Sequence, residues 1–192
     1  RDYLMVINTN IAGQKSDRKI IEKIDHLSEV SADGSIINTV KITRTHTGIK
    51  NEILTGVRNV DWLRIYVPQG SELLSAEGFR QPDEKYFSEK PEANWEENKL
   101  LRNENEAIID LNSRTKIYSE NNKTVFANWA MVDPGESIII TIKYRLPFNF
   151  FDSIASFGWW EKVNSLFNPD MSSLIPYNLI IQKQPGAQAS SL

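Results

Sequence analysis

From Ile20 to Thr47 the chain reads IIEKIDHLSEVSADGSIINTVKITRTHT, and this stretch decides the fold class. Two β-branched segments, residues 20–30 and 36–47, flank an Asp33-Gly34 pair. Asp-Gly between such segments is a strong hairpin signal, because a two-residue turn needs positive φ at both central positions. The second segment also alternates apolar with polar side chains, as a half-buried strand does. We therefore predict a β-hairpin with Asp33-Gly34 at its tip.

The two-residue turn also predicts how the two histidines lie. In that register His26 lies opposite Lys41. His46 lies opposite Ile21, well away from His26 along the ladder. A lysine beside one ring disfavours a bound cation, so we interpret both histidines as solvated strand residues rather than metal ligands.

The rest of the chain carries further strand signals separated by turn residues. Pro68-Gln-Gly70 and Asp133-Pro134-Gly135 are typical of such breaks. The expected strands cover residues 3–7, 61–67, 73–78, 107–111, 115–118, 124–131, 137–146 and 177–181. Sustained helical periodicity is nearly missing. The fold class predicted is mainly β, an antiparallel β-sandwich with short helical insertions.

The strand pattern predicts one β-sandwich domain over residues 1–182. It is interrupted by an acidic loop insertion, 80–107, and an aromatic-rich insertion, 148–173. Residues 183–192 have the composition of a linker-like tail, and both chain ends look like cuts in a longer polypeptide.

Two short helices are expected inside the insertions. The first spans Asn94 to Arg102, with Asn94 as its cap and Glu97 at the capping-box position. The second spans Ser153 to Phe167.

Trp129 is predicted to be a core residue. It shares a strand face with Val125, Ala127 and Met131. Replacing a core aromatic of this size by alanine costs roughly 3–5 kcal/mol.

Composition and motifs exclude several classes of function. The chain has a net charge of −3 and no cysteine. Without a basic cluster, nucleic acid is not expected as a partner, and thiol or cysteine-based metal chemistry is ruled out. No apolar run long enough for a membrane span occurs. Hydrolase, phosphate-loop and calcium-loop motifs are missing, so we predict no catalytic residue, no metal and no cofactor. The acidic stretch 84–106 is interpreted as solvated charge.

The aromatic-rich insertion is the candidate partner contact. Adjacent indoles on a helix point about 100° apart, so one of Trp159 and Trp160 is expected to face outward. Phe157 and Phe167 complete the candidate surface. The alternative is a lid that closes the open end of the sandwich, and the excess of acids disfavours an anionic lipid surface.

The segment Asn8-Thr-Asn-Ile-Ala-Gly-Gln-Lys-Ser-Asp17 resembles the Asn-x-Asn-Ile-x-Gly-x-Lys-x-Asp motif of the bacterial family called domain of unknown function 4012. Segments 59–71, 123–129, 133–147 and 177–185 resemble that family in the same order. The resemblance covers most of the chain apart from 80–107 and 148–173. It implies the C-terminal section of the outer part of a membrane-anchored envelope protein, hence an extracytoplasmic location. It carries over no catalytic residue.

The function expected is a non-catalytic structural or interaction module of such an envelope protein. Its partner would be the rest of a longer chain, another envelope protein or cell-wall glycan. The alternative is a carbohydrate-binding or carbohydrate-processing domain of the cell wall. That alternative calls for exposed, coplanar aromatic rings in a groove, with two carboxylates beside an exposed tryptophan.

Overall fold

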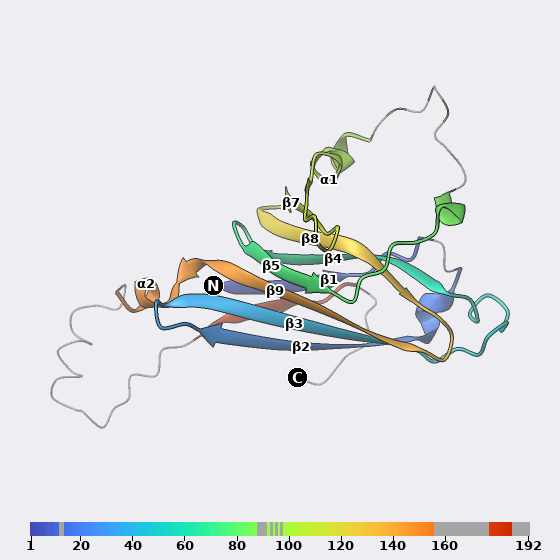
Figure 1. Ribbon diagram of the computed structural model, residues 1–192, viewed down its shortest axis with the longest axis horizontal. Helices are drawn as coiled ribbons and strands as arrows, with labels where there is room; N and C mark the ends of the chain where they lie inside the picture. Colours follow the sequence, from blue (N-terminus) through green and yellow to red (C-terminus); the bar gives the residue numbers. More distant parts are fainter. Residues whose placement is uncertain are drawn as a thin grey trace.

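The structure is a computed structural model that describes residues 1–11, 14–87, 92, 94, 96, 98–155 and 177–185. In this part of the chain two β-sheets pack face to face (Figure 1), which confirms the predicted mainly β sandwich. The larger sheet has the order β10 (Leu179–Gln182), β1 (Asp2–Ile7), β4 (Asn59–Pro68), β8 (Lys123–Val132), β7 (Lys116–Glu120) and β6 (Ile108–Ile109). The smaller sheet has the order β2 (Ile20–Val30), β3 (Ser35–His46), β9 (Ser137–Asn149) and β5 (Glu72–Glu77).

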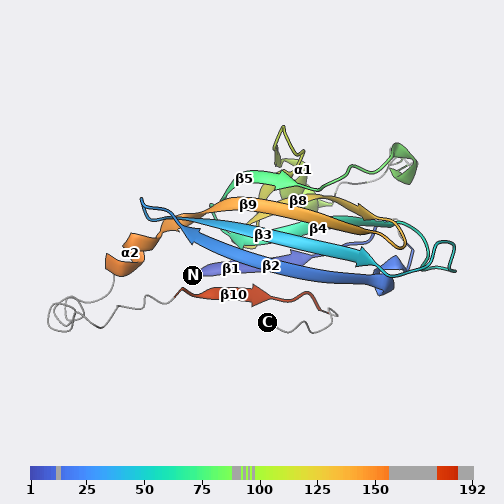
Figure 2. The same cartoon turned by 60° about the horizontal axis from the view of Figure 1, so that its bottom comes forward.

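Neighbouring strands in the described sheets are antiparallel with one exception. β10 runs parallel to β1 and pairs Leu179 with Asp2 and Gln182 with Met5. β1 and β10 come from the two ends of the described chain. Their pairing places β10 at the edge of the larger sheet, beside β1 and below β2 in Figure 2.

The core lies between the two sheets and is built by alternation along each strand. Ile140, Ile142 and Tyr144 share one face of β9 and are fully buried. The Tyr144 ring lies 5.8 Å from the ring of Phe126 on β8, so the two sheets interlock through aromatic side chains. The other buried members are Leu4, Val6, Ile36, Val40, Ile42, Leu63, Ile65, Val67, Ala130 and Leu146.

The predicted hairpin is confirmed, but its register is shifted by one residue. Ser31 donates its backbone N–H to Ser35 O at 2.9 Å, and Gly34 N–H donates to Ser31 O at 2.9 Å. The loop thus has three residues and ends in Gly34, whose φ is +81°. Three-residue hairpin loops place a left-handed glycine at this position.

The shifted register changes the surroundings of both histidines. His26 pairs with Val40 and His46 pairs with Ile20, so they remain far apart on the ladder. His46 is fully buried: its Nε2 lies 3.0 Å from Val57 O, and its Nδ1 accepts the Gly48 N–H at 3.0 Å. The prediction of solvated strand histidines was therefore wrong for His46.

His26 is largely buried as well. Its side chain is 11% exposed, and its Nε2 lies 3.6 Å from the Asp2 carboxylate. Burial lowers the pKa of His26, while Asp2 acts in the opposite direction. His26 faces the interior because the one-residue shift places it on the buried side of β2.

The helical segments are shorter than predicted. In the acidic insertion, η2 (Glu84–Phe87), η3 (Lys99–Leu101) and α1 (Arg102–Asn105) are formed. The cap is Asn98, whose side chain accepts the Leu100 N–H at 3.0 Å, so the predicted cap at Asn94 was wrong.

The other helical segments are η1 (Ser16–Lys19) and α2 (Phe150–Ala155). β9 runs three residues past its expected end at Leu146, which moves the start of α2 ahead of Ser153. Residues 156–167 of the predicted helix lie outside the described part of the chain. No described helix has the length and apolarity that a membrane span requires.

Gly34 offers a test of the hairpin loop, with Gly135 as a matched control. Both have φ of +81°, so alanine at either position strains the backbone by roughly 1–2 kcal/mol. A Cβ at Gly34 would also lie 2.2 Å from Asn149 Oδ1 and 2.5 Å from Phe151, whereas Gly135 has open space. We expect Gly34→Ala to lower the free energy of unfolding more than Gly135→Ala, as measured by urea titration. Equal losses would contradict the described contact between the hairpin tip and the end of β9.

Candidate functional site

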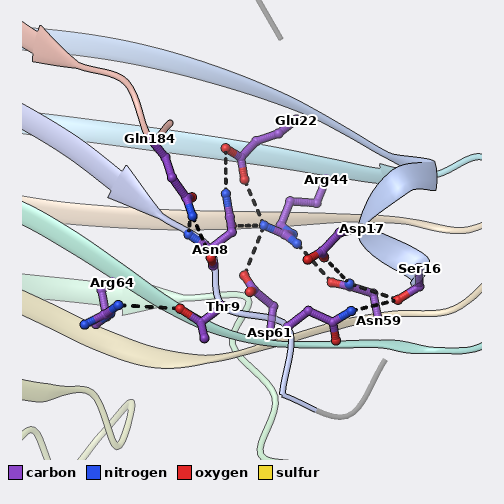
Figure 3. A network of polar contacts seen from close by, with 11 residues as sticks. Asn8, Thr9, Ser16, Asp17, Glu22, Arg44, Asn59, Asp61, Arg64 and Gln184 are labelled. Atoms are coloured by element: carbon purple, nitrogen blue, oxygen red, sulfur yellow. Dashed lines mark hydrogen bonds and ion pairs between the residues drawn. The ribbon is translucent and has the colours of Figure 1, made fainter. Parts of the chain in front are cut away.

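The densest polar cluster surrounds the guanidinium of Arg44 on β3 (Figure 3). Arg44 is 1% exposed, although its charge would normally stay in water. Its Nη1 lies 2.9 Å from Glu22 Oε2 and 3.1 Å from Asp61 Oδ2, and both carboxylates come from other strands. Its Nη2 donates to Asn59 Oδ1 at 2.9 Å, and Nη1 donates to Asn8 Oδ1. Arg44 thus binds groups from both sheets.

Both ends of the segment that resembles the envelope family, Asn8 and Asp17, form hydrogen bonds with residues of this cluster. Asn8 Nδ2 donates to Glu22 at 3.2 Å. Asn59 Nδ2 donates to Asp17 at 2.6 Å and to Ser16 at 3.1 Å, and Ser16 is fully buried. These bonds hold η1 and the end of β1 against the other strands of the sandwich (Figure 3).

The C-terminal segment is tied to the same cluster. Gln184 Oε1 accepts the Asn8 N–H at 2.9 Å, and Gln184 Nε2 donates to Asn8 O at 3.0 Å. Gln184 lies two residues into the predicted tail, so ordered contacts extend beyond position 182.

Asp61 is the member of the cluster whose ionisation is most perturbed. Burial raises its pKa to about 7; Arg44 acts against this, while Asp17 and Glu22 raise the pKa further. Desolvation disfavours the charged form of a carboxylate, and two further carboxylates nearby add repulsion.

The cluster has the features of a structural staple. Its charged groups face partners from the same chain; Arg44 and Asp61 are buried, Glu22 is partly buried and Asp17 is exposed. In the described residues, no three His, Asp or Glu side chains are arranged to hold a metal ion.

A second cluster lies on the outer face of the larger sheet. The rings of Trp62 and Trp129 are directly paired across β4 and β8, with centroids 4.8 Å apart and planes tilted by 55°. Phe87 of the acidic insertion lies 5.2 Å from Trp129, and Lys116 Nζ lies 5.7 Å from the Trp62 ring.

Trp129 is therefore only half-buried and does not lie between the sheets. The prediction that it belongs to the core was wrong, because β8 carries apolar residues on both faces. Its neighbours Val125 and Ala127 are buried on that outer face, in one cluster with Tyr66 and Tyr118 of the flanking strands.

The acidic insertion covers part of this outer face. Asn103 Nδ2 donates to Ser119 O at 2.8 Å, and Tyr118 donates its hydroxyl hydrogen to Glu104 at 3.3 Å. Glu104 is half-buried, so not all of the acidic stretch is solvated charge.

Two hollows lie on the surface of the described residues. The first contains Glu72, which binds Arg145 at 2.6 Å, and also Asp152. The second contains Asp133, which binds Arg58 through two hydrogen bonds of 2.7 and 2.6 Å. Tryptophan lines neither hollow.

The candidate partner contact, Phe157, Trp159, Trp160 and Phe167, lies outside the described residues. Sequence reasoning missed Arg44, although a signal was present. Arg44 is separated from Ile36, Val40 and Ile42 by even numbers of residues along β3. Side chains at such positions point to the same face of a strand, so Arg44 is expected to face the core.

No known protein family, curated protein or solved structure matches this chain.

Neighbouring residues of β8 test the assignment of faces. Phe126 is fully buried between the sheets, so Phe126→Ala should cost about 3–5 kcal/mol. Trp129→Ala should cost less, about 2–3 kcal/mol despite the larger ring, because a partly buried side chain gains only part of the usual burial energy. Thermal or urea unfolding of the two variants measures the difference. A larger loss for Trp129→Ala would mean that the main core lies on the Trp129 face of β8 and not on the Phe126 face.

Asp61 predicts a specific dependence of stability on pH. Its folded pKa of about 7 lies above the ordinary value of 3.8. The stability that Asp61 supports is therefore complete below about pH 4 and is lost as pH rises through about 7. We expect wild type to lose stability relative to Asp61→Asn over that range, in urea titrations at a series of pH values.

Asp133→Asn is the control for the pH series. Arg58 lowers the pKa of Asp133, so this carboxylate is ionised in both states between about pH 5 and 8. Its stability difference from wild type should stay constant there. A constant difference for Asp61→Asn as well would mean that Asp61 is ionised in the folded protein.

Proposed function

We propose that this domain is a non-catalytic structural and interaction module in the outer part of a bacterial envelope protein. The observation that carries the proposal is the state of the Arg44 cluster. The Arg44 guanidinium and the Asp61 carboxylate are buried and face each other, and the partly exposed Glu22 binds the same guanidinium, which supports a role of the cluster in holding the fold together.

The resemblance of the Asn8–Asp17 segment to an envelope family supports the location. The contacts of that segment suit a structural motif, since Asn8 and Asp17 bind side chains of the sandwich. The partner we propose is the rest of a longer chain or another envelope protein.

A second candidate function is binding of cell-wall glycan. The Trp62–Trp129 pair favours it, because two partly buried indoles lie side by side on a sheet face with a lysine next to them. Two observations count against it. The ring planes are tilted by 55° rather than coplanar, and Phe87 packs against Trp129.

Titration with soluble peptidoglycan fragments separates the two candidates. For a structural module we expect no saturable change in tryptophan fluorescence, no heat of binding in calorimetry and no release of new reducing ends. Glycan binding would appear as a saturable signal that Trp62→Ala removes. Phe151→Ala, which alters an exposed aromatic residue elsewhere, would leave that signal intact.

The proposed cellular location is tested by a separate experiment. In intact cells of the source organism, protease added from outside should cleave the domain before the cells are lysed. Protection until lysis would refute the envelope part of the proposal.

A further inference from the structure

β2 forms a free edge of the smaller sheet. One side of β2 pairs with β3 over all eleven residues, and the other side pairs with no described strand. Four apolar side chains of β2 are 39% to 62% exposed, namely Ile21, Ile24, Leu27 and Val30. An unpaired edge with exposed apolar side chains is a template for another strand.

The other edges of the described sheets are short or interrupted. β6 has two residues and β10 has four. β5 has six residues and a register shift between Leu73 and Ser75. β2 pairs without a shift and contains neither proline nor glycine. Among these edges, β2 is therefore the one best suited to pairing with another strand.

The hydrogen bonds at the two ends of β2 show which backbone groups face outward. Ser31 N–H donates to Ser35 O, and Thr47 N–H donates to Lys19 O. Odd-numbered residues therefore bond to β3, because bonded and non-bonded pairs alternate in an antiparallel ladder. The N–H and C=O groups of Glu22, Ile24 and His26 consequently point to the free edge.

We propose that two copies of this chain associate through their β2 strands, antiparallel about a two-fold axis at Ile24. When the two-fold axis passes through one residue, even-numbered residues pair with even-numbered residues of the partner. These are the residues whose N–H and C=O groups point to the free edge. In this register Lys23 faces the partner's Asp25. Ile21 faces the partner's Leu27, and the two Ile24 side chains meet on the axis.

The charge pattern of β2 favours this register over its neighbours. An axis at Lys23 would place two lysines opposite each other, and an axis at Asp25 would oppose two carboxylates. Like charges directly opposite destabilise a strand pair. With the axis at Ile24, Glu22 faces the partner's His26 and Lys19 faces the partner's Glu29.

The association would also cover the open side of the sandwich. Ile24 and Val30 point toward the interior side of the smaller sheet but remain 39% and 47% exposed. Pairing would turn the two four-stranded sheets into one continuous sheet and bring these side chains out of water. The inference does not depend on the cellular location proposed above.

Analytical ultracentrifugation of the 192-residue chain over a concentration series tests the proposal, and a concentration-dependent dimer is expected. Ile24→Pro should abolish the dimer without unfolding the monomer, since the Ile24 N–H points outward and serves no bond to β3. Ile139→Thr is the control, because Ile139 is 52% exposed on β9 but distant from the edge.

Charge reversal tests the register and remains decisive if Ile24→Pro does not fold. Lys23→Asp sets carboxylates against each other twice per dimer and should raise the dissociation constant about tenfold or more, which corresponds to about 1.4 kcal/mol. The double variant Lys23→Asp/Asp25→Lys should restore the affinity.

Oxidative cross-linking tests the axis directly, because the chain has no cysteine of its own. Two Cα atoms in a bonded antiparallel pair lie about 5.5 Å apart, within disulfide range. Ile24→Cys should form a covalent dimer on oxidation, and Ile139→Cys should not. A monomer at every concentration, or a dimer that persists unchanged in Lys23→Asp, would overturn the proposal.

Discussion

The burial of the Arg44 guanidinium is the constraint on which one end of the sandwich depends. Removing such a charge from water costs several kcal/mol unless carboxylates and amide oxygens replace the lost hydration. The replacements come from Asn8 after β1, from Glu22 on β2, and from Asn59 and Asp61 on β4. Because β2 and β3 belong to one sheet and β1 and β4 to the other, satisfying one charge fixes both sheets relative to each other. Any partial opening at this end would leave a buried ion without its partners.

The strands could be predicted because a sheet that is covered on one face alternates with period two. The turn could not be settled in the same way. Asp-Gly occurs in two-residue loops and in three-residue loops that end in a left-handed glycine. Gly34 has positive φ whereas Asp33 does not, and the Asp33 carboxylate accepts the Ser35 N–H at 3.0 Å. These local bonds favour the longer loop, and the sequence signal for the two loops is the same.

Burial was predictable for Arg44 but not for Trp129. On β3 Ile36, Val40 and Ile42 occupy one face while the other face is mostly Ser, Thr and Lys, so the even-numbered position of Arg44 places it on the buried face. On β8 apolar side chains occupy both faces, because those on the outer face pack with Tyr66 and Tyr118 of the flanking strands, next to the acidic insertion. The alternation along β8 then puts Trp129 on the same face as Val125 and Ala127, but it does not indicate which face packs against the other sheet. The partners of Arg44 were likewise hidden, since they come from segments far apart in the chain.

The same contacts that stabilise the fold also shape the free edge of β2. Glu22 is held by Arg44, and Ser28 donates its hydroxyl hydrogen to the Tyr177 hydroxyl at 2.9 Å. Both side chains point to the interior side, so β2 is anchored from within at two places while its outward N–H and C=O groups stay uncovered by any described strand. A strand held in this way loses little conformational freedom when a second strand binds, and this lowers the entropic cost of association. The buried arginine that orders the sandwich therefore also anchors β2, the longest edge strand of the described sheets.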